Sequence, residues 1–226
     1  SLKRYLQCPR MYYYHDIKKL REHHFSLKPQ NFEIGTILHD ILENIYTKQR
    51  VFTSSSDLYT TILKEFENIK QFNPYLIFEI ELWKKKIYKF VENEIKRFEK
   101  NIKVLDCERV FKLNYNGINI NGKIDRIDIL ENGKIDILDY KSSKSLKIDT
   151  KSNFEKSVDF QLEFYYLALS QSHEINEVCY YDLTTGITKD ETMLDEKLKV
   201  LDTIFENLPK KEVNFEKCDN KQLCSQ

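Results

Sequence analysis

The apolar residues of this 226-residue chain change their spacing near residue 103. Before that point they recur every three or four positions, as in the stripe from Ile34 to Tyr46, which is typical of amphipathic helices on a core. From Val104 to Ser142 the spacing becomes that of strands, and Asn-Gly pairs at 116–117 and 132–133 interrupt it. This pattern predicts three strands joined by tight turns.

The remaining periodicity predicts helices on both sides of these strands. We expect helices over 2–12, 34–46, 54–72, 75–101, 157–171 and 195–207, with a strand over 178–183 and a turn at 184–186 leading to a short strand. The order predicts a mixed α/β (α+β) domain on a small mixed sheet, made of a three-strand meander, a helix and a strand. We divide this single domain, 1–226, into a helical N-terminal lobe (1–103), an α/β core (104–208) and a Cys-bearing tail (209–226).

The composition excludes several classes of protein. With 36 basic and 36 acidic residues, the chain has no overall attraction to nucleic acid, so such binding would need a local patch. No apolar run approaches the roughly 20 residues of a membrane helix, and the polar, basic start is not a signal peptide. We therefore expect a cytoplasmic protein with no membrane partner, whose five Cys are reduced thiols or metal ligands. The chain begins with Ser1, which suggests a piece of a longer protein.

Two carboxylates face each other across the second predicted hairpin. A two-residue loop at Asn132-Gly133 would pair Asp125 with Tyr140, whereas a three-residue loop pairs Asp125 with Asp139 and places isoleucines opposite isoleucines. We prefer the three-residue loop because apolar burial specifies register. By alternation, Asp128 and Asp136 lie on the opposite face, where we expect solvated side chains.

Opposed carboxylates repel unless a positive charge lies between them. Lys141 supplies one charge, and a divalent cation such as Mg²⁺ would supply more. Such a cation can polarise a phosphodiester and activate a water, which Lys141 could orient. The alternative is that Asp139 and Lys141 are polar residues at the end of a strand, because Asp-x-Lys is common by chance.

Four further residues are candidates for supporting roles. His39 lies one helical turn after Gly35 and is a ligand or an ordinary packed histidine. Gln161 and Tyr165 share one helix face, where they would hydrogen-bond a phosphate or form a polar helix edge. Arg126 would contact a DNA phosphate or pair with an acid.

Five segments of the chain, in order, resemble motifs of the RecB/AddB branch of the PD-(D/E)XK nucleases. They are the opening helix with Cys8-Pro9, Gly35-Thr-Ile-Leu-His39, Gly122-Lys-Ile-Asp125-Arg-Ile-Asp128, Asp139-Tyr140-Lys141 and Gln161-Leu-Glu-Phe-Tyr165. The resemblance implies a restriction-endonuclease-like core and a metal-dependent DNA nuclease, often the nuclease module of a helicase–nuclease in DNA repair and recombination. Related members serve in CRISPR adaptation.

The resemblance also implies roles for individual residues. His39, Asp125, Asp139 and the carbonyl of Tyr140 would hold Mg²⁺ or Mn²⁺. Lys141 would be catalytic with the two aspartates, and Gln161 and Tyr165 would assist it.

Many AddB-like relatives hold a [4Fe–4S] cluster with one early and three late cysteines. Here Cys8 matches the early ligand, whereas Cys218 and Cys224 are the late candidates and no Cys-x-x-Cys is present. Three residues cannot supply four ligands, so the cluster is absent or the chain stops before its remaining ligands. We favour the second explanation because the sequence ends two residues after Cys224.

The leading hypothesis is a Mg²⁺- or Mn²⁺-dependent DNA exonuclease domain that works with DNA and a helicase domain or subunit. The main alternative is a non-catalytic nucleic-acid-binding or scaffolding module that retains the nuclease fold. A third hypothesis is an iron–sulfur protein, against which the missing Cys-x-x-Cys argues.

Overall fold

The computed structural model describes residues 1–20, 31–70, 73–142, 146, 148–208 and 215–218. The helices are α1 (Leu2–Gln7), α2 (Pro9–Tyr12), α3 (Asn31–Lys48), α4 (Ser55–Glu67), α5 (Pro74–Lys86), α6 (Tyr88–Glu99), α7 (Gln161–Leu169) and α8 (Leu194–Asn207), with a π-helical turn at Tyr13–Ile17 and a 3-10 turn at Phe154–Lys156. The strands are β1 (Lys103–Tyr115), β2 (Ile118–Ile129), β3 (Ile135–Lys141), β4 (Ile175–Asp182) and β5 (Ile187–Asp190). Within this described part, no helix combines the length and apolar character needed to cross a membrane.

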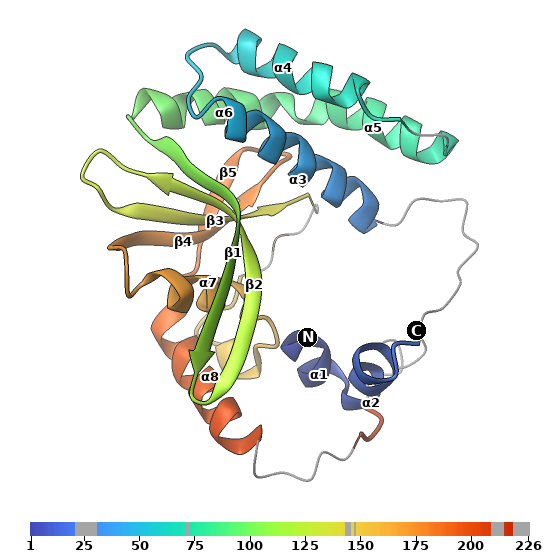
Figure 1. Cartoon of the computed structure of the whole chain (residues 1–226), viewed down its shortest axis with the longest axis vertical. Coiled ribbons are helices and arrows are strands. Elements are labelled where there is room, and N and C mark those ends of the chain that lie inside the picture. The colour runs from blue at the N-terminus through green and yellow to red at the C-terminus, as the bar shows by residue number, and fades with distance from the viewer. Residues whose placement is uncertain (21–30, 71–72, 143–145, 147, 209–214, 219–226) are drawn as a thin grey trace.

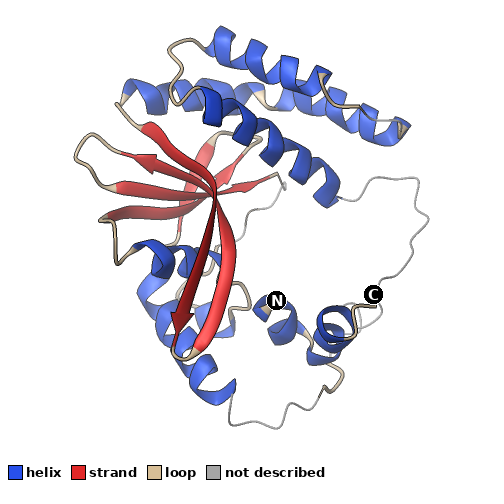
Figure 2. Cartoon of the chain, viewed as in Figure 1, coloured by secondary structure: helices blue, strands red, loops and turns tan. Residues whose placement is uncertain are grey.

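The strands form one mixed sheet in the order β1-β2-β3-β4-β5. β3 and β4 are parallel, and the other neighbouring strands are antiparallel. Helices lie on both sides of the sheet, α3 to α6 on one side and α7 and α8 on the other (Figures 1 and 2). The predicted mixed α/β class is confirmed.

Each side of the sheet has its own apolar core. The helical lobe buries its stripe against Leu138, Tyr140 and Tyr181 of the sheet. On the other side, Ile127 and Ile137 pack with apolar residues of α7, and a third cluster lies between α7, α8 and the end of the β1–β2 ribbon. The predicted packing of a helical lobe on the sheet holds for α3 to α6, whereas Leu2 and Leu6 of α1, which we placed in the same lobe, pack with the third cluster instead.

Two of the predicted helices are each divided into two. The helix expected over 2–12 breaks at Cys8, whose φ of −160° is extended, because Pro9 disfavours helical backbone at the preceding residue. The helix expected over 75–101 breaks at Ile87, where ψ is −13° as in a 3-10 turn. The Ile87 side chain stays buried, so the apolar stripe runs across the break and the periodicity does not reveal it.

The β2–β3 hairpin has the predicted register. Ile127 pairs with Ile137 and Ile129 with Ile135. The Leu130 amide donates to the Lys134 carbonyl at 2.9 Å, which closes the three-residue loop. Gly133 has a φ of +82°, a left-handed conformation that glycine adopts without steric cost.

Candidate active site

Six of the predicted site residues meet near the end of β3, between α3 and α7. His39 comes from α3, Asp125 from β2, and Asp139 and Lys141 from β3. Gln161 and Tyr165 are separated by one turn of α7. The fold thus brings together residues from four elements that are far apart in the sequence.

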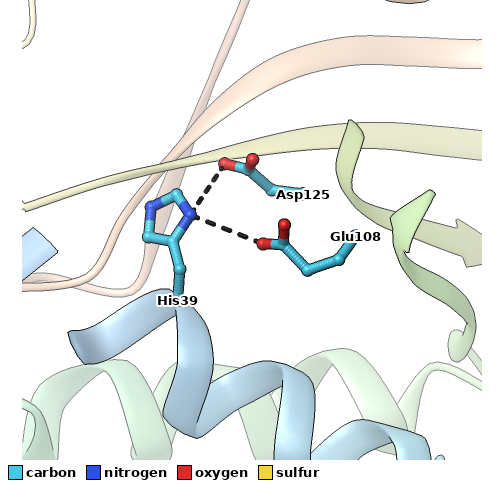
Figure 3. A group of neighbouring side chains, drawn as sticks. All are labelled: His39, Glu108 and Asp125. Atoms are coloured by element: carbon cyan, nitrogen blue, oxygen red, sulfur yellow. Dashed lines mark ion pairs between the residues drawn. The ribbon is translucent and has the colours of Figure 1, made fainter. Parts of the chain in front are cut away.

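Three side chains form a group that could hold a metal ion. His39 Nδ1 lies 3.5 Å from Asp125 Oδ2 and 3.6 Å from Glu108 Oε1 (Figure 3). One ligand atom from each residue lies within 4.8 Å of the others. Asp139 is not part of this group of described residues, although its charge acts on both Asp125 and His39.

Asp139 belongs to a neighbouring ring of polar contacts. Its Oδ2 atom lies 2.5 Å from Lys141 Nζ, and Lys141 donates to Gln161 Oε1 at 3.2 Å. Gln161 Nε2 donates to the Tyr165 hydroxyl at 2.8 Å, which in turn donates to Asp139 Oδ1 at 3.3 Å. The Asp139 side chain is 1% exposed and that of Lys141 is 31% exposed, so the ring holds a buried acid against an accessible amine.

The charges of the site shift the pKa values of its acids and its histidine. Asp125 accepts a hydrogen bond from the Tyr140 amide at 2.8 Å, yet burial and then the charge of Asp139 raise its pKa to about 7. Burial opposes the protonation of His39, but Glu108 and the two aspartates prevail and raise its pKa. Burial would raise the pKa of Glu108 as well, but His39 and Lys123 hold it below its usual value. The raised pKa values of Asp125 and His39 reflect crowded carboxylates, a repulsion that a bound cation would relieve.

Glu108 is the site residue that our sequence analysis missed. The first hairpin could have revealed it. Tyr115 pairs with Ile118 across a two-residue turn, and the same register, followed for seven residues along each strand away from the turn, brings Glu108 opposite Asp125. The pairs on either side of that position follow this register. Glu108 itself has a φ of +50°, a conformation that few non-glycine residues adopt.

A sequence model of the PD-(D/E)XK nuclease superfamily matches residues 1–225. The chain belongs to this superfamily. Its relatives include proteins of Streptococcus pyogenes that are named as a subunit of an ATP-dependent helicase/deoxyribonuclease. The relative from serotype M12 (strain MGAS2096) is 41% identical over 87 residues, which are 37% of this chain and 8% of that protein. The relative from serotype M1 is 40% identical over 87 residues. These matches therefore cover a small part of the relatives' length.

Arg126 is buried, whereas the predicted contact with a DNA phosphate requires an exposed side chain. Its side chain is 0% exposed and lies 2.5 Å from Glu94 Oε1. Arg126 Nε also donates to Asp128 Oδ1 at 2.6 Å, and the guanidinium lies 4.7 Å from the centre of the Tyr46 ring. The prediction of phosphate contact is wrong, and pairing with acids, the alternative we left open, is correct.

Asp128 and Asp136 are buried, which corrects the prediction of solvated side chains. α6 places Arg97 over this face, and its NH2 atom lies 2.9 Å from Asp128 and 3.3 Å from Asp136. Asn176 also donates to Asp136 at 2.8 Å. The alternation of faces was correct, but it does not show whether a helix covers a face.

The structure describes two of the three cysteines that have a predicted iron–sulfur role. Cys8 is buried and Cys218 is half-buried, whereas Cys224 lies outside the described residues. The segment 215–218 contacts the first helices, because the Phe215 ring lies 4.6 Å from that of Tyr13. The cluster stays a prediction, as does the Tyr140 carbonyl as a metal ligand.

Proposed function

We propose that this domain is a deoxyribonuclease that depends on Mg²⁺ or Mn²⁺ and hydrolyses phosphodiester bonds. One observation carries the proposal: in a chain of a nuclease superfamily, a histidine and two carboxylates converge within 4.8 Å beside the Asp139–Lys141 pair.

The donor set fits a divalent cation. Carboxylate oxygens suit Mg²⁺ and Mn²⁺, and an imidazole is compatible with Mn²⁺. Glu108 Oε1 is buried and accepts no hydrogen bond from the described residues, so it has capacity for a further positive partner. His39, Glu108 and Asp125 would hold the ion, with Asp139 and the Tyr140 carbonyl as the further predicted ligands. When bound, the ion would neutralise phosphate charge and lower the pKa of a water.

Lys141 is the proposed catalytic amine. Its partly exposed ammonium can orient the attacking water or stabilise the charge that develops on the phosphate. Gln161 and Tyr165 hold Lys141 and Asp139 in place through the hydrogen-bonded ring. Such support matters because small displacements of a catalytic group are costly in rate.

We further propose DNA as the substrate, exonucleolytic action, and work beside a helicase domain or subunit in DNA repair or recombination. The name of the Streptococcus pyogenes relatives supports a helicase–deoxyribonuclease setting. The motif order in this chain supports the same setting.

The test is Mg²⁺-dependent degradation of labelled single- and double-stranded DNA, with EDTA as the metal-free arm. We expect Asp139→Asn and Lys141→Ala each to lower the rate by about 100-fold or more while circular dichroism stays that of the wild type. Lys100→Ala, at the exposed end of α6, is the matched control and should degrade DNA normally. Undiminished cutting by purified Asp139→Asn would rule out the site. DNA binding without metal-dependent degradation by the wild type would instead support the non-catalytic module.

A further inference from the structure

Lys123 is a cation at the outer side of the metal-binding group. It lies on β2, two residues before Asp125, and its Nζ atom forms an ion pair with Glu108 Oε2. The other carboxylate oxygen of Glu108 faces His39. The Lys123 side chain is 53% exposed and that of Glu108 is 6% exposed, so the ammonium covers the outer side of this carboxylate.

A groove runs from this lysine along the β1–β2 ribbon. Its volume is about 890 Å³, and its lining includes Lys123 together with Gln161 and Tyr165 of the polar ring. Aromatic side chains from α1, α2, α7 and α8 line other parts of its wall, and aromatic rings can stack on nucleic-acid bases. Lys123 therefore both lines the groove and pairs with Glu108 of the metal-binding group, so it connects the two.

Lys123 and a bound metal cation would compete for the negative charge of Glu108. An ammonium and a divalent cation attract the same carboxylate charge, so each weakens the attraction of the other. Once Glu108 shares its charge with a cation, the exposed ammonium of Lys123 is available to an anion in the groove. A phosphate of the substrate is such an anion.

We propose that Lys123 is a positioning residue with two partners: it pairs with Glu108 before a cation binds, and afterwards with a substrate phosphate in the groove. Binding of the cation and of DNA then reinforce each other. By thermodynamic reciprocity, DNA raises the affinity for the cation by the same factor by which the cation raises the affinity for DNA. The proposal rests on the proposed function, since it assumes both ligands.

The first test measures Mn²⁺ binding by calorimetry without DNA. We expect Lys123→Gln to bind Mn²⁺ roughly two- to fivefold more tightly than the wild type, because the competing ammonium is gone. The matched control is Lys112→Gln: Lys112 lies opposite Asn121, two positions further along the same ribbon, and this substitution should leave the Mn²⁺ affinity unchanged.

The second test measures DNA binding by fluorescence anisotropy, with Mn²⁺ or with EDTA, in a Lys141→Ala background that slows turnover. We expect Mn²⁺ to raise DNA affinity less in Lys123→Gln than in the background protein. The slope of log affinity against log salt should also fall by about 0.7 to 0.9, the value for one lost phosphate contact.

The outcomes separate this proposal from the proposed function. If the wild type binds no Mn²⁺, the proposed function fails. If it binds Mn²⁺ but Lys123→Gln and Lys112→Gln behave alike in both tests, Lys123 has no such role and the proposed function is untouched. A purely structural role would not tighten Mn²⁺ binding.

Discussion

The β2–β3 hairpin places acids of the same type in two clusters that balance their charge differently. We name them the site cluster (His39, Glu108, Asp125, Asp139 and Lys141) and the arginine network (Glu94, Arg97, Arg126, Asp128 and Asp136). In the arginine network every carboxylate accepts hydrogen bonds from strong donors. The Tyr46 and Tyr181 hydroxyls donate to Glu94 at 2.6 and 2.7 Å. Two nitrogens of Arg126 donate to Asp128 at 2.6 and 2.9 Å.

The carboxylates of the site cluster are paired less completely, although Lys123 pairs with Glu108 Oε2 and Lys141 with Asp139. Glu108 Oε1 accepts no hydrogen bond from the described residues, and burial together with Asp139 raises the pKa of Asp125 to about 7. A cluster whose carboxylates are satisfied stabilises the fold, whereas one that retains unsatisfied negative charge can bind a cation.

The largest expected effect is on the arginine network. Arg126→Met should lower the free energy of unfolding by about 3–5 kcal/mol, because Glu94 and Asp128 lose their buried partner. Asp125→Asn, one residue away, should not lower it, since this change removes repulsion from Asp139. Urea denaturation in EDTA measures both variants, and equal losses would contradict the division into two clusters.

The next effect concerns the missed ligand. Glu108→Gln should weaken Mn²⁺ binding by about 10- to 100-fold, because a neutral amide replaces a carboxylate of the ligand group. Asp136→Asn, in the arginine network, is the matched acid-to-amide control and should keep the Mn²⁺ affinity. Calorimetry measures both, and an unchanged affinity of Glu108→Gln would remove it from the ligand group.

The pH dependence should separate the clusters further. Mn²⁺ affinity should fall by about tenfold or more between pH 8 and pH 6, because protons compete for Asp125, whose pKa burial and Asp139 raise to about 7, and for His39, whose pKa the nearby carboxylates raise. In EDTA, the melting temperature should instead fall as the pH rises from 6 to 8. A carboxyl whose folded pKa is raised contributes stability at low pH that is lost as the pH rises through 7.

A second carboxyl titrates in the same range and provides the control. Burial raises the pKa of Glu163 to about 7 as well, and Lys197, at 2.8 Å, opposes that shift. Glu163→Gln should therefore reduce the pH dependence of the melting temperature but keep that of Mn²⁺ binding. Loss of the Mn²⁺ dependence in Glu163→Gln would show that Asp125 is not the competing group.

The smallest expected effect is on stability, and it tests what fixes the register of the strands that carry the two clusters. Gly133→Ala should cost about 1–2 kcal/mol of stability through its left-handed backbone alone, since nothing lies within 4 Å of the added Cβ. Gly117→Ala, with a φ of +79° and equally open surroundings, is the matched control. Neither should alter Mn²⁺ affinity, because the paired isoleucines hold the register. A selective loss in Gly133→Ala would assign that role to the turn.

The sequence predicted the second hairpin because its information is local. Apolar alternation specifies a register that Gly133 accommodates at the turn, and that register sets Asp125 against Asp139. The position of Glu108 opposite Asp125 could be predicted in the same way from the Asn116-Gly117 turn. Its left-handed backbone could not be predicted, because glutamate has no local preference for that conformation. The two helix breaks differ in the same way. Pro9 predicts the break at Cys8, whereas the apolar stripe continues across Ile87 and gives no sign of the break there.

The sequence by itself therefore determined the strands, the register and the two faces on which the acids lie. Only the tertiary structure decided which acids became a site. Asp128 lies three residues after Asp125, yet α6 brings Glu94 and Arg97 to its face, while α3 brings His39 and no arginine to Asp125. Alternation assigns a side chain to a face, but the charge that meets it depends on elements distant in the sequence, and that charge separates a buried ion-pair network from a cation site.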